Sequence, residues 1–443
     1  MEFQYRRNHS KDVFDAVETN DLGSLQRLEK RGLIKNYTEH RHMFTHRTPL
    51  LEAVRLGRDY EIIKILFENG ANPFVTADEK GILHFSVEFN EFEKTRFILE
   101  NCCQTLENQL LKPENFKNAS IEQEKLNFVN QRDRYGQTTL HVALGTLPNQ
   151  VDTEKQENLL RLVKLLLEYG SDVNAINETG QSPIFRCVDS RFTEIAKCLL
   201  QHGAKTNVID DIGRTPLFSC IEHIAIVNLL VLAGADVKFE DEHKTTPLHN
   251  SVKFSTVTQF LISKGADINS IDNRGNTPIY NAVNFGNLES IKILFKAGAN
   301  IFVRNYMNNT LLHTALRQHN SAPITEFLIK QHLDVNAKNL DGTTPLMMTA
   351  QSRSLTSAML LWQEGVDIHS RNNEGMSALD LVSGDGEWTE TNPVYQFLKA
   401  EICRQRNMAF AMAYHDRLGA ASKAKILEKD SIQLVLNMLN GVE

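Results

Sequence analysis

The sequence has little proline and few cysteines for its 443 residues. With 11 prolines and 41% hydrophobic residues, long disordered or collagen-like stretches are not expected, so most of the chain should fold. The six cysteines fall at irregular intervals, at Cys102, Cys103, Cys187, Cys198, Cys220 and Cys403. This spacing fits neither a zinc site nor a disulfide framework, and it indicates a reducing compartment.

Long apolar runs and basic clusters are also missing. No stretch approaches the roughly 18 to 20 apolar residues that cross a bilayer, and the polar residues 1–10 precede no apolar signal core. The formal net charge is −7, and no Lys/Arg cluster of the kind that neutralises a phosphate backbone occurs. We therefore expect an intracellular protein, cytoplasmic or nuclear, with no membrane insertion and no nucleic-acid partner.

The motifs of common enzymes are absent as well. The sequence has no glycine-rich phosphate loop, no Gly-x-Ser-x-Gly elbow and no His-Glu-x-x-His helix. Cys220 and His223 could suggest a nucleophile and its base, but Cys220 lies on the apolar side of a predicted helix, where a thiol packs and stays inert. The sequence predicts no catalytic residue, no cofactor and no metal, and hence no enzyme.

A four-residue phrase recurs along the chain. Its clear copies have Thr-Pro and then Leu or Ile, and they begin at Thr215, Thr246, Thr277 and Thr344. Weaker copies begin at Thr48, Thr138, Ser182, Thr310 and Ser377, and a worn copy begins at Gly81. From Ser182 onward, successive copies lie 31 to 34 residues apart. Because a hydroxyl side chain caps a helix N-terminus and proline suits the first turn, each copy predicts the start of a helix.

A second apolar run follows each phrase. The runs at 159–167 and 291–295 have the helical spacing of a packed face. A glycine such as Gly298 stands just after the run, where a left-handed residue ends a helix at little cost, although His332 takes this place in one unit. A turn such as 272–275 then leads into the next phrase. Each unit is predicted to contain two helices and a hairpin-like turn.

The phrase and its period resemble the ankyrin repeat. The resemblance covers residues 11–401 and implies an all-α ankyrin-repeat solenoid of helix-turn-helix units, ten of which carry the phrase. It divides the chain into an N-terminal cap unit at 1–46, a repeat array at 47–401 and a helical tail at 402–443. Since ankyrin proteins hold other proteins at their turn tips and inner helices, it implies a non-enzymatic scaffold or adaptor with one or more protein partners.

Two insertions interrupt the period. The first, near 101–130, carries leucines, Ile121 and Phe128 among polar residues and should extend one helix and add another. The second, near 145–158, carries Pro148 and Asp152 and should be a loop. Insertions in a solenoid lie on its surface, where they either serve binding or are merely tolerated.

The tail leaves the repeat pattern. Its last part resembles the opening of an F-box, although Glu428 replaces the proline of that family; the matching residues are Leu427, Asp430, Val435, Leu436 and Leu439. This resemblance implies docking to a ubiquitin-ligase adaptor, as in ankyrin proteins of large DNA viruses or intracellular bacteria that act as effectors in host cytoplasm. The alternative is a helical cap on the hydrophobic face of the last repeat.

Two kinds of polar residue recur at fixed places in the units. His84, His141, His249 and His313 end their phrases, where a structural hydrogen bond between neighbouring units is favoured over catalysis or metal binding. Asn174, Asn269 and Asn336 follow Asp-Val or Asp-Ile in the turn. Ankyrin proteins are sometimes hydroxylated at such asparagines, and a turn-stabilising role is the alternative.

Counting from the phrase identifies the residues at turn tips and on inner helices. The predicted partner-binding residues are Arg134, Tyr135, Ile212, His243, Phe285, Tyr306, Met307, Arg317 and Leu340. Exposed aromatic and arginine side chains commonly anchor protein interfaces. Tyr306 and Met307, with Leu340 in the next unit, are expected to form an apolar patch unless they fold inward. Two functions remain open: a scaffold that needs only the repeats, and a ligase substrate receptor that also needs the tail.

Overall fold

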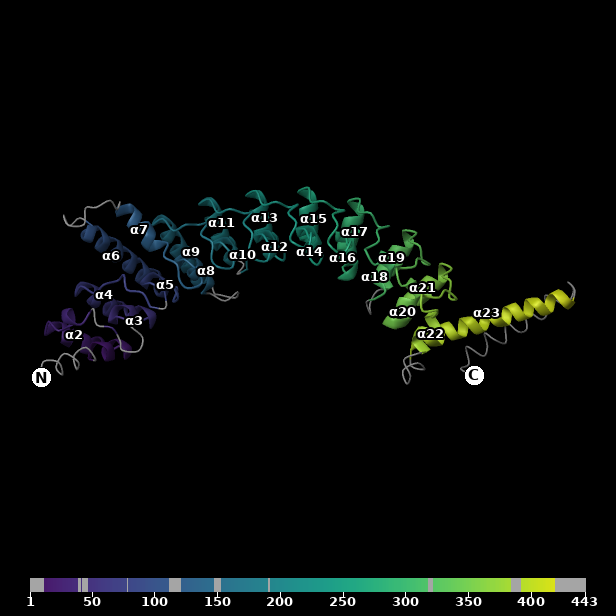
Figure 1. Cartoon of the computed structure of the whole chain (residues 1–443), viewed down its shortest axis with the longest axis horizontal. Coiled ribbons are helices and arrows are strands. Elements are labelled where there is room, and N and C mark those ends of the chain that lie inside the picture. Colours follow the sequence, from purple (N-terminus) through teal and green to yellow (C-terminus); the bar gives the residue numbers. More distant parts are fainter. Residues whose placement is uncertain are drawn as a thin grey trace. The chain divides into compact units, whose positions relative to one another are not determined.

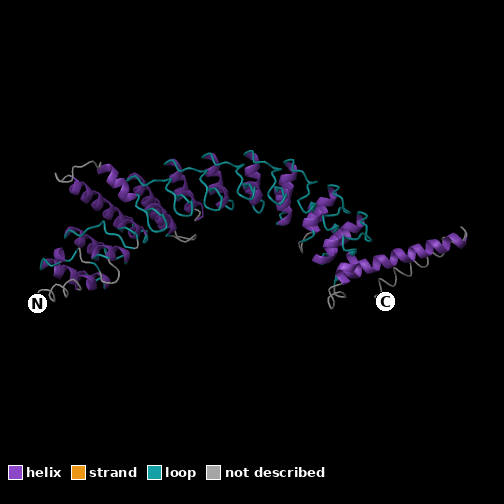
Figure 2. Ribbon diagram, in the orientation of Figure 1, coloured by secondary structure: helices purple, strands orange, loops and turns teal. Residues whose placement is uncertain are grey.

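The computed structural model describes residues 12–38, 41, 47–77, 79–110, 121–146, 153–189, 192–317, 322–383 and 392–418. Within these ranges the chain consists of helices, turns and loops, with β geometry only at two isolated bridges (Figure 2). The predicted all-α class is therefore confirmed. The chain divides into two compact units, the first unit at Met1–Glu242 and the second unit at His243–Glu443. This division falls inside the predicted repeat array.

Helices follow one another in pairs along the first unit (Figure 1). Residues 12–18 are helical. The elements after them are α2 (Leu22–Lys30), the 3-10 helix η1 (Ile34–Asn36), α3 (Pro49–Arg55), α4 (Tyr60–Glu68), α5 (Ile82–Val87), α6 (Phe92–Leu110), α7 (Ile121–Val129), α8 (Thr139–Gly145), α9 (Thr153–Glu168), α10 (Pro183–Asp189), α11 (Thr193–Gln201), α12 (Pro216–Ser219) and α13 (Ile224–Leu232).

The second unit continues the same alternation and ends in a longer helix. Its helices are α14 (Pro247–Ser251), α15 (Ser255–Ser263), α16 (Pro278–Asn284), α17 (Leu288–Lys296), α18 (Leu311–Ala315), α19 (Ala322–Lys330), α20 (Pro345–Ser352), α21 (Leu355–Gln363), α22 (Ala378–Ser383) and α23 (Pro393–Leu418).

The recurring phrase starts the first helix of each pair, as predicted. Thr246 has an extended backbone, and its hydroxyl accepts a hydrogen bond from the His249 N–H at 3.4 Å. Thr48 caps α3 in the same way. Proline then occupies the first helical position, where its missing N–H costs nothing. The helix start is thus a local property of the phrase.

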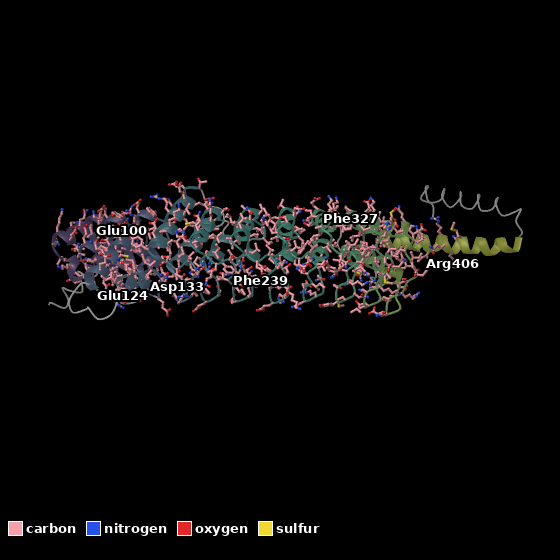
Figure 3. The ribbon with its side chains drawn as sticks, turned by 90° about the horizontal axis from the view of Figure 1, so that it is seen from above. Glu100, Glu124, Asp133, Phe239, Phe327 and Arg406 are labelled. Carbon is pink, nitrogen blue, oxygen red and sulfur yellow. The ribbon has the colours of Figure 1, made fainter. Side chains whose placement is uncertain are left out.

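Buried aliphatic side chains hold successive repeats together. In the second unit, α14 packs against α16, α16 packs against α18, and α15 packs against α17. Leu248, Ile279 and Leu312 occupy the same position of three phrases and are fully buried. Burial of each such side chain stabilises by about 1.5 to 3 kcal/mol. Side chains fill the spaces between the helices (Figure 3). The stability of a repeat therefore depends on its neighbours.

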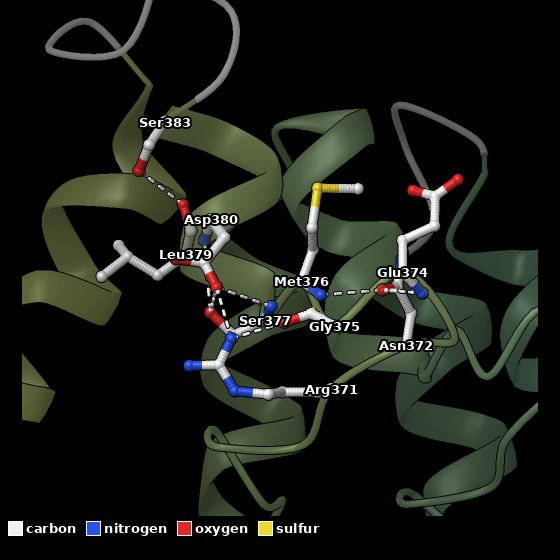
Figure 4. A network of polar contacts seen from close by, with 9 residues as sticks. All are labelled: Arg371, Asn372, Glu374, Gly375, Met376, Ser377, Leu379, Asp380 and Ser383. Atoms are coloured by element: carbon white, nitrogen blue, oxygen red, sulfur yellow. Dashed lines mark hydrogen bonds and ion pairs between the residues drawn. The ribbon is translucent and has the colours of Figure 1, made fainter.

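An Asp or Asn side chain holds each of seven turns. Its Oδ1 accepts the main-chain N–H groups two and four residues further on, at 2.8 to 3.3 Å, in turns that begin at Asp133, Asn177, Asp210, Asp272, Asn305, Asn339 and Asn372. The turn at Asn372 and the phrase that follows it are drawn in Figure 4. There, Ser377 and Asp380 bond each other's main-chain N–H groups at the start of α22.

Left-handed residues end the second helices. Gly298 has φ +97° after α17, and the glycines at the corresponding places also have positive φ. His332, which replaces glycine after α19, adopts the same conformation with φ +60°. A side chain with a Cβ is strained there, so the departure in sequence leaves the turn intact at an energetic cost.

The predicted structure agrees with the observed structure for the first insertion and differs from it in part of the second. The first behaves as predicted: α6 extends to Leu110, α7 is added, and Lys125 on α7 forms an ion pair with Glu107 on α6 at 2.6 Å. The loop predicted for 145–158 is wrong in its second half, because α9 already begins at Thr153. Residues 154–158 include Glu, Lys and Gln, which are good helix formers and lengthen the following amphipathic helix.

Helix α23 covers the last repeat with its first turns. Val394 and Leu398 are buried, and the ring of Phe397 meets that of Trp362 at a centroid distance of 6.2 Å. Residues 403–408 of the same helix are exposed. The boundary predicted between 401 and 402 thus falls inside a continuous helix, whose covering part precedes it. The F-box-like positions Leu427, Asp430, Val435, Leu436 and Leu439 lie outside the described residues.

Candidate protein-binding groove

All nine predicted partner-binding side chains are exposed in the structure. They divide between the units, with Arg134, Tyr135 and Ile212 in the first and the others in the second. In the first unit, the Arg134 guanidinium lies 4.6 Å from the centroid of the Tyr135 ring, which keeps both side chains at the turn tip. Ile212 occupies the tip of the turn held by Asp210.

An open groove of about 670 Å³ brings most of the remaining predicted residues together. It lies in the second unit, and its lining includes His243, Phe285, Tyr306, Met307 and Arg317. His243 comes from one turn, Tyr306 and Met307 come from the turn two repeats further on, and Phe285 and Arg317 follow the ends of α16 and α18. Positions one repeat apart in the sequence thus contribute to one binding surface.

Tyr306, Met307 and Leu340 occupy neighbouring turn tips and do not fold inward. Their side chains are 68%, 50% and 57% exposed. The Tyr306 N–H donates to the Arg274 carbonyl, and the Leu340 N–H donates to the Met307 carbonyl, both at 3.1 Å. A Cβ on Gly275 would come within 2.8 Å of the Tyr306 ring, so the ring lies directly against this glycine. Leu340 extends the apolar patch but does not line the groove.

A network of hydrogen bonds supports the groove from below. Asn305 Nδ2 donates to the buried Tyr280 hydroxyl at 3.0 Å and lies 3.4 Å from Asn276 Oδ1. Asn339 Nδ2 donates to Asn309 Oδ1 at 3.0 Å. Burial raises the pKa of Tyr280, which therefore stays protonated at neutral pH. We call Asn276, Asn305, Asn309 and Asn339 the amide ladder; it fixes the carboxamides that face the groove.

Several residues that line the groove were not predicted from the sequence. Asn250 and Asn281 lie four residues after the threonine of their phrase, and Asn284 lies seven residues after it, as does the predicted Arg317. Spacings of four and seven place side chains on one face of a helix. The recurrence of asparagine at these positions could have identified them from the sequence. Arg274 also lines the groove, from the turn before Asn276.

The phrase histidines form hydrogen bonds between neighbouring repeats, as predicted. His141 Nδ1 accepts the Thr138 N–H at 3.2 Å, and Nε2 lies 3.0 Å from the Gln181 carbonyl in the next repeat. His249 and His313 bridge to Asn276 and Thr343 in the same manner. Burial lowers the pKa of His141 to about 4. The neutral ring satisfies both partners, so these histidines contribute to the fold by joining neighbouring repeats.

The turn asparagines also link neighbouring repeats. Asn174 Nδ2 donates to the Gly203 carbonyl at 3.0 Å, and its Oδ1 accepts the Lys205 N–H at 2.8 Å. Asn269 and Asn336 accept main-chain N–H groups of the following repeats in the same way. These bonds assign the asparagines the turn-stabilising role.

The six cysteines differ in exposure and in contacts, and the Sγ of Cys198 lies 3.9 Å from Nδ1 of His202. All are free thiols, and all but Cys403 are buried. Burial raises the pKa of Cys103 to about 11 and that of Cys102 well above its usual range, which keeps both thiols protonated. Cys220 is fully buried, and its Sγ lies 3.6 Å from the Leu217 carbonyl.

In the described ranges, no three His, Cys, Asp or Glu residues gather closely enough to hold a metal ion. None of the helices in the same ranges has the length and apolar character needed to span a bilayer.

The repeat architecture agrees with a comparison to known families. The family model for ankyrin repeats (3 copies) matches residues 151–241, 222–305 and 311–387. These matches cover the residues of the groove and of its amide ladder except Tyr306, Met307 and Asn309, which lie between two matched ranges. Taken together they span more than half of the sequence, and the chain belongs to the ankyrin-repeat family.

Proposed function

We propose that this chain is a protein-binding scaffold or adaptor that holds a partner protein in the groove of its second unit. Ankyrin repeats are protein-interaction modules, and they are generally not enzymes. The observation that carries the proposal is the grouping of exposed aromatic, methionine and arginine side chains from consecutive repeats around one groove. Side chains of these types dominate the binding energy of protein interfaces.

The groove is suited to binding because its frame is rigid. The turn tips are hydrogen-bonded to one another, and the amide ladder and Tyr280 fix the side chains beneath them. A surface that is already ordered loses little conformational freedom when a partner binds. We further propose that the protein acts inside a cell, since its thiols are free and mostly buried.

A double substitution tests the groove directly. Tyr306→Ala with Leu340→Asp removes an exposed ring and places a charge beside Met307. We expect partner capture to fall strongly, because truncation of an interface anchor commonly costs about 2 kcal/mol or more. The melting temperature should stay within a few degrees of the wild type, because both side chains are exposed. The assay is affinity capture from cell lysate with the full chain, read by quantitative mass spectrometry.

Phe302→Ala is the matched control. Phe302 is 68% exposed, as Tyr306 is, and lies in the same unit, but it does not line the groove. Capture should survive this change. Equal capture by the groove variant and the wild type would contradict the proposal, and loss of folding in the groove variant would show that the two side chains are part of the core.

A second candidate function is a substrate receptor for a ubiquitin ligase, including one that acts as an effector in a host cell. Its support is the F-box-like pattern at 427–439, which lies outside the described residues. Residues 403–408 are exposed, so this part of α23 does not cover the last repeat. That exposure favours a tail with a further role. The covering contacts come instead from Val394, Phe397 and Leu398.

A truncation after Leu418 separates the two functions, because it keeps α23 whole. Loss of ubiquitin-ligase subunits from the captured proteins, with other partners retained, is expected for the receptor. An unchanged set of partners would leave the repeats as the entire binding function.

A further inference from the structure

Carboxamide side chains dominate the polar lining of the groove in the second unit. Asn250 and Asn281 come from equivalent positions of α14 and α16, Asn284 comes from the next turn of α16, and Asn276 and Asn309 come from the turns. Each carboxamide offers two N–H donors and an acceptor oxygen. An extended peptide main chain presents the complementary C=O and N–H groups along its length. An apolar helix face offers these amides no hydrogen-bonding groups.

The amide ladder sets the direction of the donors and acceptors. Asn309 Oδ1 accepts from Asn339, and Asn276 Oδ1 lies 3.4 Å from the Asn305 amide. In both residues the oxygen is engaged from one side, which leaves the NH2 group to face other acceptors. In Asn276 that group lies 3.1 Å from Asp272 Oδ2. The Asn309 side chain also hydrogen-bonds to the Tyr280 hydroxyl, so the ladder fixes the orientation of both carboxamides.

The free charges of the groove are positive, although the whole chain has a net charge of −7. Arg274 and Arg317 line it, and Lys253 lies over the Phe285 ring with its Nζ 4.4 Å from the centroid. Among the described residues, no carboxylate forms an ion pair with Arg274 or Arg317. The one acidic lining residue, Asp272, is 9% exposed and accepts the N–H groups of its own turn at 2.8 Å.

Apolar contact is available beside these charges. Phe285 borders the groove from the end of α16, and Tyr306 and Met307 border it from a turn tip. The groove therefore combines two cations, a row of carboxamides and an apolar border. An occupant that satisfies all three has an accessible main chain, acidic side chains and an apolar residue close to them.

We infer that the groove binds an extended, acidic peptide segment of a partner protein, with its main chain on the asparagines and its carboxylates on Arg274 and Arg317. This inference rests on the proposed protein-binding function and specifies the partner's chemistry. Three repeats at the usual 8 to 10 Å spacing of packed helices span about 20 Å, which corresponds to about six residues at roughly 3.3 Å each. An aromatic or aliphatic side chain of the segment packs on Phe285 or Tyr306.

A positional-scanning library of acetylated, amidated and fluorescein-labelled hexapeptides tests the inference with the full chain. We expect enrichment of Asp or Glu at one or two positions and of an aromatic or aliphatic residue at another. Binding of the selected peptide should weaken by about 5- to 30-fold in Arg274→Gln with Arg317→Gln, as two partly exposed ion pairs are lost. Binding should also weaken at high salt, which screens exposed charges.

Matched variants separate charge from amide recognition. Lys264→Gln with Lys296→Gln removes two cations of the same unit that do not line the groove, and it should leave binding unchanged. Asn281→Asp keeps the shape of the side chain but replaces donors with a negative charge, so it should weaken binding of the acidic peptide. N-methylation of the main-chain amides of the selected peptide should weaken binding as well.

Several results would overturn the inference. They are enrichment of Lys or Arg, selection of no sequence at all, an acidic peptide whose affinity ignores the arginine substitutions, and equal affinity for a labelled octathymidylate. If no peptide is selected while lysate capture still depends on Tyr306 and Leu340, the proposed function stands and this inference fails. If neither assay depends on the groove, both fail.

Discussion

Acidification should destabilise the first unit, because the folded chain keeps His141 in its neutral form. The ring is fully buried, its Nδ1 accepts the Thr138 N–H, and its Nε2 lies 3.0 Å from the Gln181 carbonyl. Burial lowers the pKa to about 4, and the nearby Arg186 and Arg132 also lower it. A proton added at Nδ1 would face the Thr138 N–H and break the bond that caps α8.

The sign and size of the effect follow from proton linkage. The unfolded histidine has a pKa near its usual 6.5 and binds a proton as the pH falls through that value, whereas the folded one does not until about pH 4. Stability is therefore lost between these two values. With pKa values of 6.5 in the unfolded chain and about 4 in the folded chain, the free energy of unfolding falls by about 2 kcal/mol between pH 7.5 and pH 5. Below pH 4 the total loss is about 3 kcal/mol. Burial lowers the pKa of His84 and His313 too, which adds to the loss.

The assay compares hydrogen exchange of the α8 and α10 amides at the two pH values, after correction for intrinsic rates. Local exchange is appropriate because repeat proteins open in segments. His141→Met is the informative variant, since Met347 occupies the equivalent position of another repeat and lies fully buried with its Sδ 3.4 Å from the Thr344 N–H. Its absolute stability can differ from the wild type, but its pH dependence should shrink by about 2 kcal/mol.

Substitution of the exposed His202 by Gln serves as the control and should leave the pH dependence of these amides unchanged. An undiminished pH dependence in His141→Met would refute the reasoning, because the lost stability would then arise from groups other than this ring.

Three more outcomes can be measured. His332→Gly should stabilise the second unit by a few tenths to about 1 kcal/mol by relieving left-handed strain, and Gly298→Ala should destabilise it; thermal unfolding of both variants checks the pair. Asp380→Ala should cost about 1 kcal/mol through loss of the cap on α22, and an unchanged exchange rate in α22 would argue against it. A thiol reagent should modify Cys403 rapidly in the native protein and the other cysteines only after unfolding; a second fast thiol would contradict their burial.

The repeats could be predicted from the sequence because the contacts that start their helices and hold their turns are local. The Thr-Pro phrase caps a helix through atoms only three residues away, and the Asp or Asn of each turn binds N–H groups two and four residues on. Such contacts do not depend on distant parts of the chain. The same local reasoning explains why His332 was recognised as a departure, and why the structure still places it in the left-handed conformation that glycine has elsewhere.

Local sequence patterns predicted helix boundaries less well where loop-forming and helix-forming residues lie close together. Pro148 and Asp152 suggested that all of 145–158 is a loop, but the helix-forming residues after Thr153 join α9. Similarly, the boundary expected near 401 followed the end of the repeat pattern, whereas helix propensity and the packing of Leu398 carry α23 past it. Hydrophobic period alone could not place either boundary.

The period and the caps specify the number and order of the repeats, because each arises from bonds within a few residues. The stacking of the repeats determines which side chains meet to form the binding surface. Asn250, Asn281 and Arg317 share one groove only because packed repeats align positions that are about one period apart in the sequence. The amide ladder, and the absence of an ion pair to Arg274 among the described residues, depend on distances between repeats, which no local pattern encodes. The binding surface therefore belongs to the tertiary structure, since it is formed by side chains that meet only when the repeats pack.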